Sequence, residues 1–98
     1  MYGTIARLRV KAGQERAFTA YGERRSAQID QTSGFVATYI YQMDNNPREF
    51  YLVVMFESKD AYFANANSAE QNQQFMEMVQ YLEAEPEWHD GEIVFGSR

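Results

Sequence analysis

Residues 35–56, FVATYIYQMDNNPREFYLVVMF, are the stretch of this 98-residue chain that decides its fold. Segments 35–43 and 49–56 are rich in aromatic and β-branched side chains, which favour strands. Between them lies DNNP at 44–47, a strong turn signal. The stretch therefore predicts a β-hairpin.

Both strands of this hairpin are apolar on both faces. One face of strand 49–56 carries Phe50, Leu52, Val54 and Phe56, and the other carries Tyr51, Val53 and Met55. An antiparallel sheet with one wet face would alternate apolar and polar residues instead. Covering the second face is worth several kcal/mol, at about 1.5–3 kcal/mol per large side chain. A second copy packed about a two-fold axis is the simplest cover, and a lone domain with a few exposed aliphatic side chains is the alternative.

A strand and a helix are expected before the hairpin. Residues 2–10 alternate with period two, so Thr4 and Ala6 share a face with Leu8, and this pattern predicts a strand. A helix is expected from Gln14 to about Gln31, and it would carry an imperfect apolar stripe.

Two capped helices and a last strand are expected after the hairpin. Ser58 can N-cap a short helix, and Ser68, with Gln71 three residues later, has the spacing of a capping box. Pro86 is expected to end the second helix, and residues 92–95 to form the last strand. The order βαββαβ over residues 1–98 predicts one α+β, ferredoxin-like domain. Its four-stranded antiparallel sheet would have helices on one face.

Composition excludes several classes of function. The net charge is −5, so nucleic acid is an unsuitable partner, and Arg24-Arg25 is too small a cationic patch to change that. No cysteine and a single histidine argue against a zinc or iron site. No segment is as long and apolar as a membrane span or a secretion signal, so we expect a cytoplasmic protein without a membrane partner.

Several motifs resemble those of a known family. They are VKAGQERAF (10–18), SGF (33–35), DNNP (44–47), FESKDAY (56–62) and ANANSAEQ (64–71). Together they resemble the antibiotic-biosynthesis-monooxygenase-like (ABM) branch of the dimeric α/β-barrel superfamily. The resemblance implies a homodimer whose sheets pack face to face, with a pocket between sheet and helices in each subunit. Members include cofactor-free monooxygenases acting on polycyclic aromatics or quinols, haem-degrading enzymes and small isomerases.

The resemblance does not extend to haem chemistry. Haem-degrading relatives use an asparagine, a tryptophan and a histidine whose positions fall here on Ala6, Asn65 and Phe75. None of the three residue types is kept. We therefore expect no haem and no other cofactor, and the sequence shows no glycine-rich nucleotide-binding loop.

Asparagines and aromatic side chains are the candidates for a small-molecule pocket. Asn65 is a candidate catalytic residue, because an amide can orient a hydroxylated ring or stabilise an oxyanion. Asn72, Phe63 and Tyr39 are candidate substrate-binding residues, and Tyr41 could line the same cavity. The alternatives are that the asparagines satisfy a helix junction and that the tyrosines are core or dimer contacts.

The Trp88-His89 pair is the other candidate. His89 has a side chain whose pKa suits a general base that removes a phenolic proton, and Trp88 could bind substrate. Asp90 is adjacent but points away from His89 in an extended segment. The alternative is a corner between helix and strand, in which Trp88 packs under the sheet edge and His89 is half exposed. Arg7 and Arg9 are expected to contact the partner subunit.

Two functions from different classes fit the sequence. The first is a cofactor-independent monooxygenase, or a related small enzyme, acting on an aromatic or quinol-type molecule. The second is a non-catalytic dimeric module that binds a small molecule or serves a stress or regulatory role. A cavity of several hundred Å³ with at least two convergent polar groups would favour the first.

Overall fold

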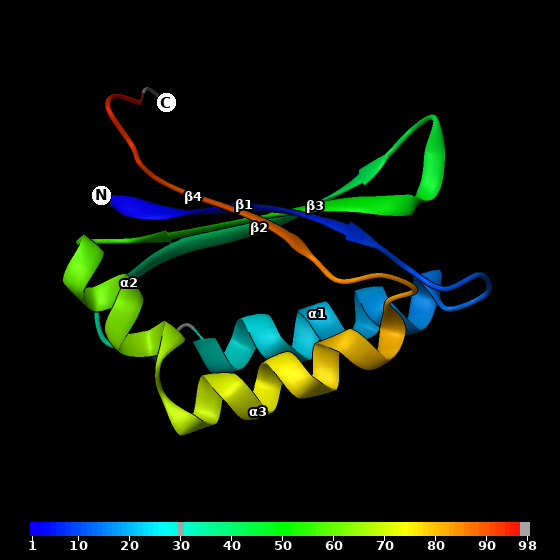
Figure 1. Cartoon of the computed structure of the whole chain (residues 1–98), viewed down its shortest axis with the longest axis horizontal. Coiled ribbons are helices and arrows are strands. Elements are labelled where there is room, and N and C mark those ends of the chain that lie inside the picture. The colour runs from blue at the N-terminus through cyan, green and yellow to red at the C-terminus, as the bar shows by residue number, and fades with distance from the viewer. Residues whose placement is uncertain (30, 97–98) are drawn as a thin grey trace.

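A computed structural model describes residues 1–29 and 31–96. The elements are β1 (Tyr2–Arg9), α1 (Glu15–Ile29), β2 (Phe35–Met43), β3 (Asn46–Phe56), α2 (Lys59–Ala66), α3 (Ala69–Met78), a 3-10 turn η1 (Val79–Tyr81) and β4 (Glu87–Glu92). The strands form one antiparallel sheet in the order β2-β3-β1-β4, with the helices on one face (Figure 1). This confirms the predicted ferredoxin-like α+β fold.

Local sequence signals placed the first three strands and the helix starts well. β2 has the predicted bounds, and β3 begins at Asn46, so the hairpin turn is shorter than expected. The Ser58 and Ser68 hydroxyls accept hydrogen bonds from the main-chain N–H groups of Ala61 and Gln71, both at 3.1 Å. These caps satisfy donors that the first turn of a helix leaves free, which fixes where α2 and α3 begin.

The last strand lies earlier than the sequence predicted. α3 ends at Met78, well before Pro86, and β4 runs Glu87–Glu92 rather than 92–95. The physical reason is the free edge of β1, whose N–H and C=O groups need partners. The chain reaches that edge at Leu82, which bridges to Val10, and β4 then pairs with β1. Trp88 and His89 are therefore strand residues, not a corner.

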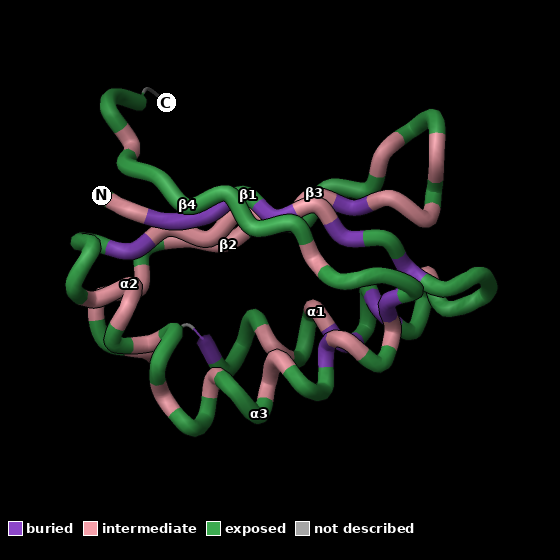
Figure 2. The backbone as a smooth tube through the Cα atoms, in the orientation of Figure 1, coloured by how far each residue is buried: buried purple, intermediate pink, exposed green. Residues whose placement is uncertain are grey.

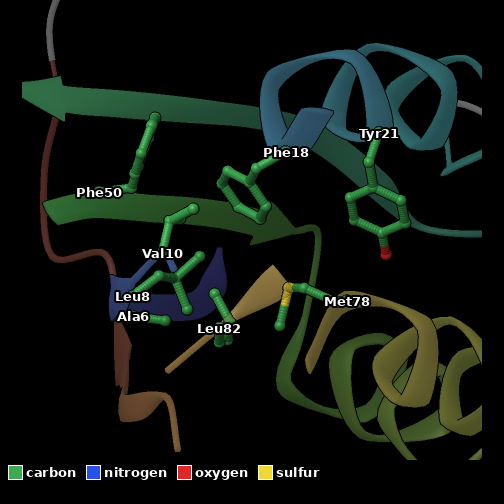
Figure 3. Close-up of a cluster of buried hydrophobic side chains, with 8 residues drawn as sticks. All are labelled: Ala6, Leu8, Val10, Phe18, Tyr21, Phe50, Met78 and Leu82. Carbon is green, nitrogen blue, oxygen red and sulfur yellow. The ribbon is translucent and has the colours of Figure 1, made fainter. Parts of the chain in front are cut away.

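The core lies between β1 and the helices. Its buried residues are Ala6, Leu8, Val10, Phe18, Tyr21, Phe50, Met78 and Leu82. Figure 3 shows these side chains converging from the sheet, α1 and the end of α3. Phe18 packs edge-on against Phe50, with ring centroids 5.0 Å apart. Burying each large side chain contributes about 1.5–3 kcal/mol, so this cluster anchors the helices to the sheet.

The other face of the sheet has no cover within the described chain. Tyr39, Tyr41 and Ile5 lie on it and are 58%, 56% and 51% exposed. Figure 1 shows no helix over this face, and Figure 2 shows β4 exposed along its length. The doubly apolar strands seen in the sequence thus leave an apolar surface on the single chain.

Ion pairs cross this uncovered face within one chain. Arg7 donates to Glu49 at 2.6 Å on β3 and to Glu87 at 2.8 Å on β4. The hydrogen bond from Arg7 lowers the pKa of the Glu49 carboxyl. Within one chain the Arg7 side chain therefore joins β1 to β3 and to β4, and its contact with a partner subunit stays a prediction.

Gly3 provides a test of the register between β1 and β3. A Cβ at Gly3 would collide with the main-chain oxygen of Val54, whereas a Cβ at its cross-strand partner Gly91 meets nothing within 4 Å. Gly3→Ala should therefore lower the free energy of unfolding by about 2 kcal/mol or more. Gly91→Ala should change it by less than about 0.5 kcal/mol. Urea denaturation of both variants checks this, and equal losses would contradict the close approach.

Candidate functional site

A cavity of about 760 Å³ lies between the inner face of the sheet and the helices. That volume is in the range of small-molecule sites in proteins. Its apolar walls include Leu8, Phe18, Tyr21, Ile29, Ile40, Phe50, Leu52, Val54, Phe56, Phe75, Met78 and Trp88. Large rings and aliphatic side chains dominate this set, so the cavity suits a flat, mainly apolar molecule.

The strand register aligns four residues in a row across the sheet, and the first three of them line the cavity, whereas the fourth lies on the exposed strand β4. Thr38 of β2 pairs with Val54 of β3, Val54 pairs with Thr4 of β1, and Thr4 pairs with Asp90 of β4. Directly opposed residues of neighbouring strands point to the same face. The row therefore brings two hydroxyls and a carboxylate to the helix side of the sheet.

Tyr62 of α2 contacts this row. Its hydroxyl donates to Asp90 Oδ1 at 2.9 Å, and its ring packs on Tyr2 and Phe56. Burial, together with the hydrogen bond to Asp90, raises the pKa of Tyr62 to about 12. Tyr62 is therefore a neutral donor to Asp90 at physiological pH, and its ring lines the cavity.

Thr4 is the unusual member of the row. It is 4% exposed and lines the cavity. Among the described residues, its Oγ1 is the buried side-chain polar atom with no hydrogen-bond partner. Thr38, on the same row, differs because its hydroxyl donates to the main-chain oxygen of Val53 at 3.0 Å.

A second polar group joins α1 to α3 at the cavity wall. Arg25 Nη2 donates to Gln71 Oε1 at 2.8 Å, and both side chains line the cavity. Tyr21 adds a bond between the same helices, donating to the main-chain oxygen of Gln74 at 3.1 Å. No carboxylate within residues 1–29 and 31–96 forms a salt bridge with Arg25, so its charge faces neutral partners.

Four predicted site residues border the cavity, and the side chains of three of them lie on its side of the sheet or on the helices above it. Asn65 near the end of α2, Asn72 of α3 and Trp88 of β4 all contribute to its wall. The Trp88 ring lies 6.1 Å from that of Phe75, so it packs against α3 and closes the cavity on the β4 side. Phe63 lies elsewhere: its ring packs on Tyr2, with centroids 5.7 Å apart.

His89 and Tyr39 lie on the opposite face of the sheet. His89 pairs with Ile5, while its neighbour Trp88 pairs with Ala6 on the cavity side. Tyr39 pairs with Val53, so its side chain points to the uncovered face, although the residue borders the cavity. The structure therefore brings Asn65, Asn72 and Trp88 together and separates His89 from them.

Sequence reasoning missed Thr4, Tyr62 and Arg25 as cavity residues. Thr4 could have been found, because it is the polar member of an otherwise apolar face of β1. The position of Asp90 beside Thr4 could not be predicted, because it depends on where β4 begins, and only the pairing with β1 defines that. Tyr62 carried no local signal beyond its place on a capped helix.

The described residues contain neither a cluster of metal-ligating side chains nor a membrane-spanning helix. Within the described ranges, no three His, Asp or Glu side chains gather as they would around a metal ion. No helix in residues 1–29 and 31–96 is long and apolar enough to cross a membrane.

The family model of the antibiotic biosynthesis monooxygenases (ABM) matches residues 1–86. A search of curated proteins gives no match. Many solved structures are similar to this chain, and three of them are described below.

A candidate antibiotic biosynthesis monooxygenase from Nitrosomonas europaea has a TM-score of 0.83 at 18% identity, covering 97% of this chain and all of its own. A second candidate, from Bordetella bronchiseptica, has a TM-score of 0.83 at 20% identity, with 96% and 97% covered. SnoaB, a cofactor-independent oxygenase from Streptomyces nogalater, has a TM-score of 0.85 at 13% identity, with 97% and 94% covered. Identities this low show a shared fold.

The Tyr62 hydroxyl should titrate late. Following its Cζ resonance by NMR should show a midpoint near pH 12, with no change near the ordinary value of about 10. Because the folded-state pKa is raised, the stabilisation from neutral Tyr62 is fully present below pH about 10. It is lost as the pH rises toward 12. Asp90→Asn should move the midpoint down but not to 10, since burial is the larger cause. A wild-type midpoint near 10 would refute both the desolvation of Tyr62 and its hydrogen bond to Asp90.

Proposed function

Because the chain belongs to the antibiotic biosynthesis monooxygenase family, we propose that it is a cofactor-independent oxygenase of an aromatic, quinol-type molecule. The family includes cofactor-independent oxygenases such as SnoaB. The observation that carries the proposal is the cavity of about 760 Å³, which has mainly apolar, ring-rich walls and several polar side chains converging on it.

Such a reaction places modest demands on the protein. Oxidation of anthrone shows the balance: a methylene carbon becomes a carbonyl, one atom of dioxygen becomes the carbonyl oxygen, and the other leaves as water with the two hydrogens. The substrate supplies all four electrons, so no external reductant is needed. The protein must orient the ring, limit water and stabilise the oxyanion that forms when the ring loses a proton.

Asn65 is the residue we assign to the oxyanion. Its position in the cavity wall near the end of α2 lets an amide N–H reach a ligand oxygen, and amide donors are suited to this role. Asn72 and Trp88 would hold the rings, Asn72 from α3 and Trp88 from β4. His89 has no part in this assignment, since it lies on the other face of the sheet.

One observation favours a second function. The single histidine of the chain is not at the cavity, so among the described residues no imidazole lines it as a candidate general base. A non-catalytic module that binds an aromatic ligand, in a stress or regulatory role, would need only the apolar walls and the polar groups. Turnover, not binding, separates the two functions.

We also propose that the chain is a homodimer formed through the uncovered sheet face. Proteins of this fold are generally homodimers. The exposed side chains of Ile5, Tyr39 and Tyr41 on that face supply apolar area that a second copy would bury.

Oxygen uptake with anthrone and with 1,4-naphthohydroquinone tests the enzymatic function. We expect Asn65→Ala to reduce kcat/KM by roughly 10- to 100-fold, because an oxyanion donor is lost. Asn67→Ala is the matched control, since Asn67 lies at the end of the same helix, is exposed and does not line the cavity. His89→Ala should also keep the wild-type rate per dimer. Ligand binding without oxygen uptake would favour the second function, and equal rates in all variants would remove Asn65 from the mechanism.

The dimer has its own test in solution. Light scattering at micromolar concentration should give about twice the 11.4 kDa of one chain. Val53 lies on β3, an inner strand of the sheet, and its side chain is on the uncovered face. Val53→Asp would bury a charge in the dimer interface, so it should shift the mass toward that of one chain. Gln73→Asp, on the exposed side of α3, should leave the mass unchanged. A wild-type mass of one chain would refute the dimer.

A further inference from the structure

We propose that the Thr4 hydroxyl binds one oxygen atom of the molecule that occupies the cavity. The site would then select aromatic molecules with a hydroxyl or carbonyl oxygen at one end over the bare ring hydrocarbon. This inference rests on the proposed function only in that it requires an aromatic ligand in the cavity. It does not require turnover.

The burial of Thr4 is the first support. Its side chain is 4% exposed, lies on the cavity wall, and has no hydrogen-bond partner among the described residues for Oγ1. Buried polar atoms without a partner are rare in native proteins, and each calls for a specific explanation. An inward-facing valine would fit the apolar pattern of β1, so the hydroxyl at this position needs a reason.

The neighbours of Thr4 decide which ligand groups fit. The Tyr62 proton is already donated to Asp90 at 2.9 Å, and an ionised carboxylate can only accept. Thr4 Oγ1 makes no hydrogen bond of good geometry with the described residues, although its proximity lowers the pKa of Tyr62. A ligand oxygen would therefore compete only with the Tyr62 oxygen for the Thr4 proton. The Tyr62 hydroxyl, which also lines the cavity, can accept a hydrogen bond from a ligand hydroxyl in return. A phenolic or quinol hydroxyl, which both donates and accepts, matches this set.

Thr38 is a matched control within the same row of the sheet. Both threonines line the cavity and both are opposed to Val54, one from each side. The Thr38 hydroxyl already donates to Val53 O at 3.0 Å, so it has no free proton for a ligand. Replacing either threonine by valine keeps the shape of the side chain and removes only the hydroxyl.

Binding of 1-naphthol and naphthalene to the full chain, measured by calorimetry, tests the inference. The wild type should bind 1-naphthol more tightly than naphthalene. Thr4→Val should weaken 1-naphthol binding roughly three- to tenfold, as expected for one hydrogen bond, and leave naphthalene binding unchanged. Thr38→Val should leave the preference for 1-naphthol intact. Thr4→Ser, which keeps a hydroxyl, should retain the wild-type preference.

Thermal unfolding without ligand gives a second readout. Thr4→Val should have a Tm equal to or above that of the wild type, because it removes an unpaired buried polar atom. Thr38→Val should have a lower Tm, because it breaks an existing hydrogen bond. A Tm for Thr4→Val that falls as far as that of Thr38→Val would show a structural role and overturn the inference.

The outcomes separate this inference from the proposed function. If 1-naphthol and naphthalene bind the wild type equally, or Thr4→Val changes neither, Thr4 has no ligand role while the aromatic cavity stands. If neither compound binds up to its solubility limit, the aromatic ligand class fails, and the inference and the proposed function fall together. Loss of 1-naphthol preference in Thr4→Val alone supports the inference, whether or not the protein consumes oxygen.

Discussion

The pairing of β1 on both of its edges is the constraint on which the rest of the structure depends. β3 binds one edge and β4 the other, so the register of β1 decides which residue of every strand except β2 faces the helices. On the helix side, β1 places Leu8 in the core near one end and Thr4 in the polar row near the other. Core packing and the polar row therefore lie at opposite ends of one strand. The helices close the space between them without filling it.

Most of the fold could be predicted from the sequence because its signals are local. Alternation placed β1, aromatic and β-branched content placed β2, and the side chains of Ser58 and Ser68 placed two helix starts. β4 could not be placed, because its residues are exposed and poor in apolar pattern, and only pairing with a distant strand defines them. The prediction of the site residues on β4 failed for the same reason. Because successive side chains of a strand point to opposite faces, a strand that begins at Glu87 directs Trp88 toward the cavity and His89 away from it.

The comparisons with solved proteins explain why the fold is better determined than the chemistry. SnoaB and this chain share a fold at 13% identity, so most of their side chains differ. A shared fold fixes the arrangement of sheet and helices, whereas a reaction depends on individual side chains. In this chain the polar groups in or beside the cavity include Asn65, the Tyr62–Asp90 pair and the Thr4 hydroxyl.

The two faces of the sheet cannot change independently. Successive residues of a strand point to opposite faces, so a slip of one residue in β1 would exchange Thr4 for Ile5 at the cavity and expose the core residues. The Arg7 pairs with Glu49 and Glu87 oppose such a slip, because a shift of one residue would turn Arg7 to the other face of the sheet and break both pairs. Charges on the uncovered face therefore help to hold the cavity face in place. A partner that covers that face would exclude water from these pairs and strengthen the same constraint.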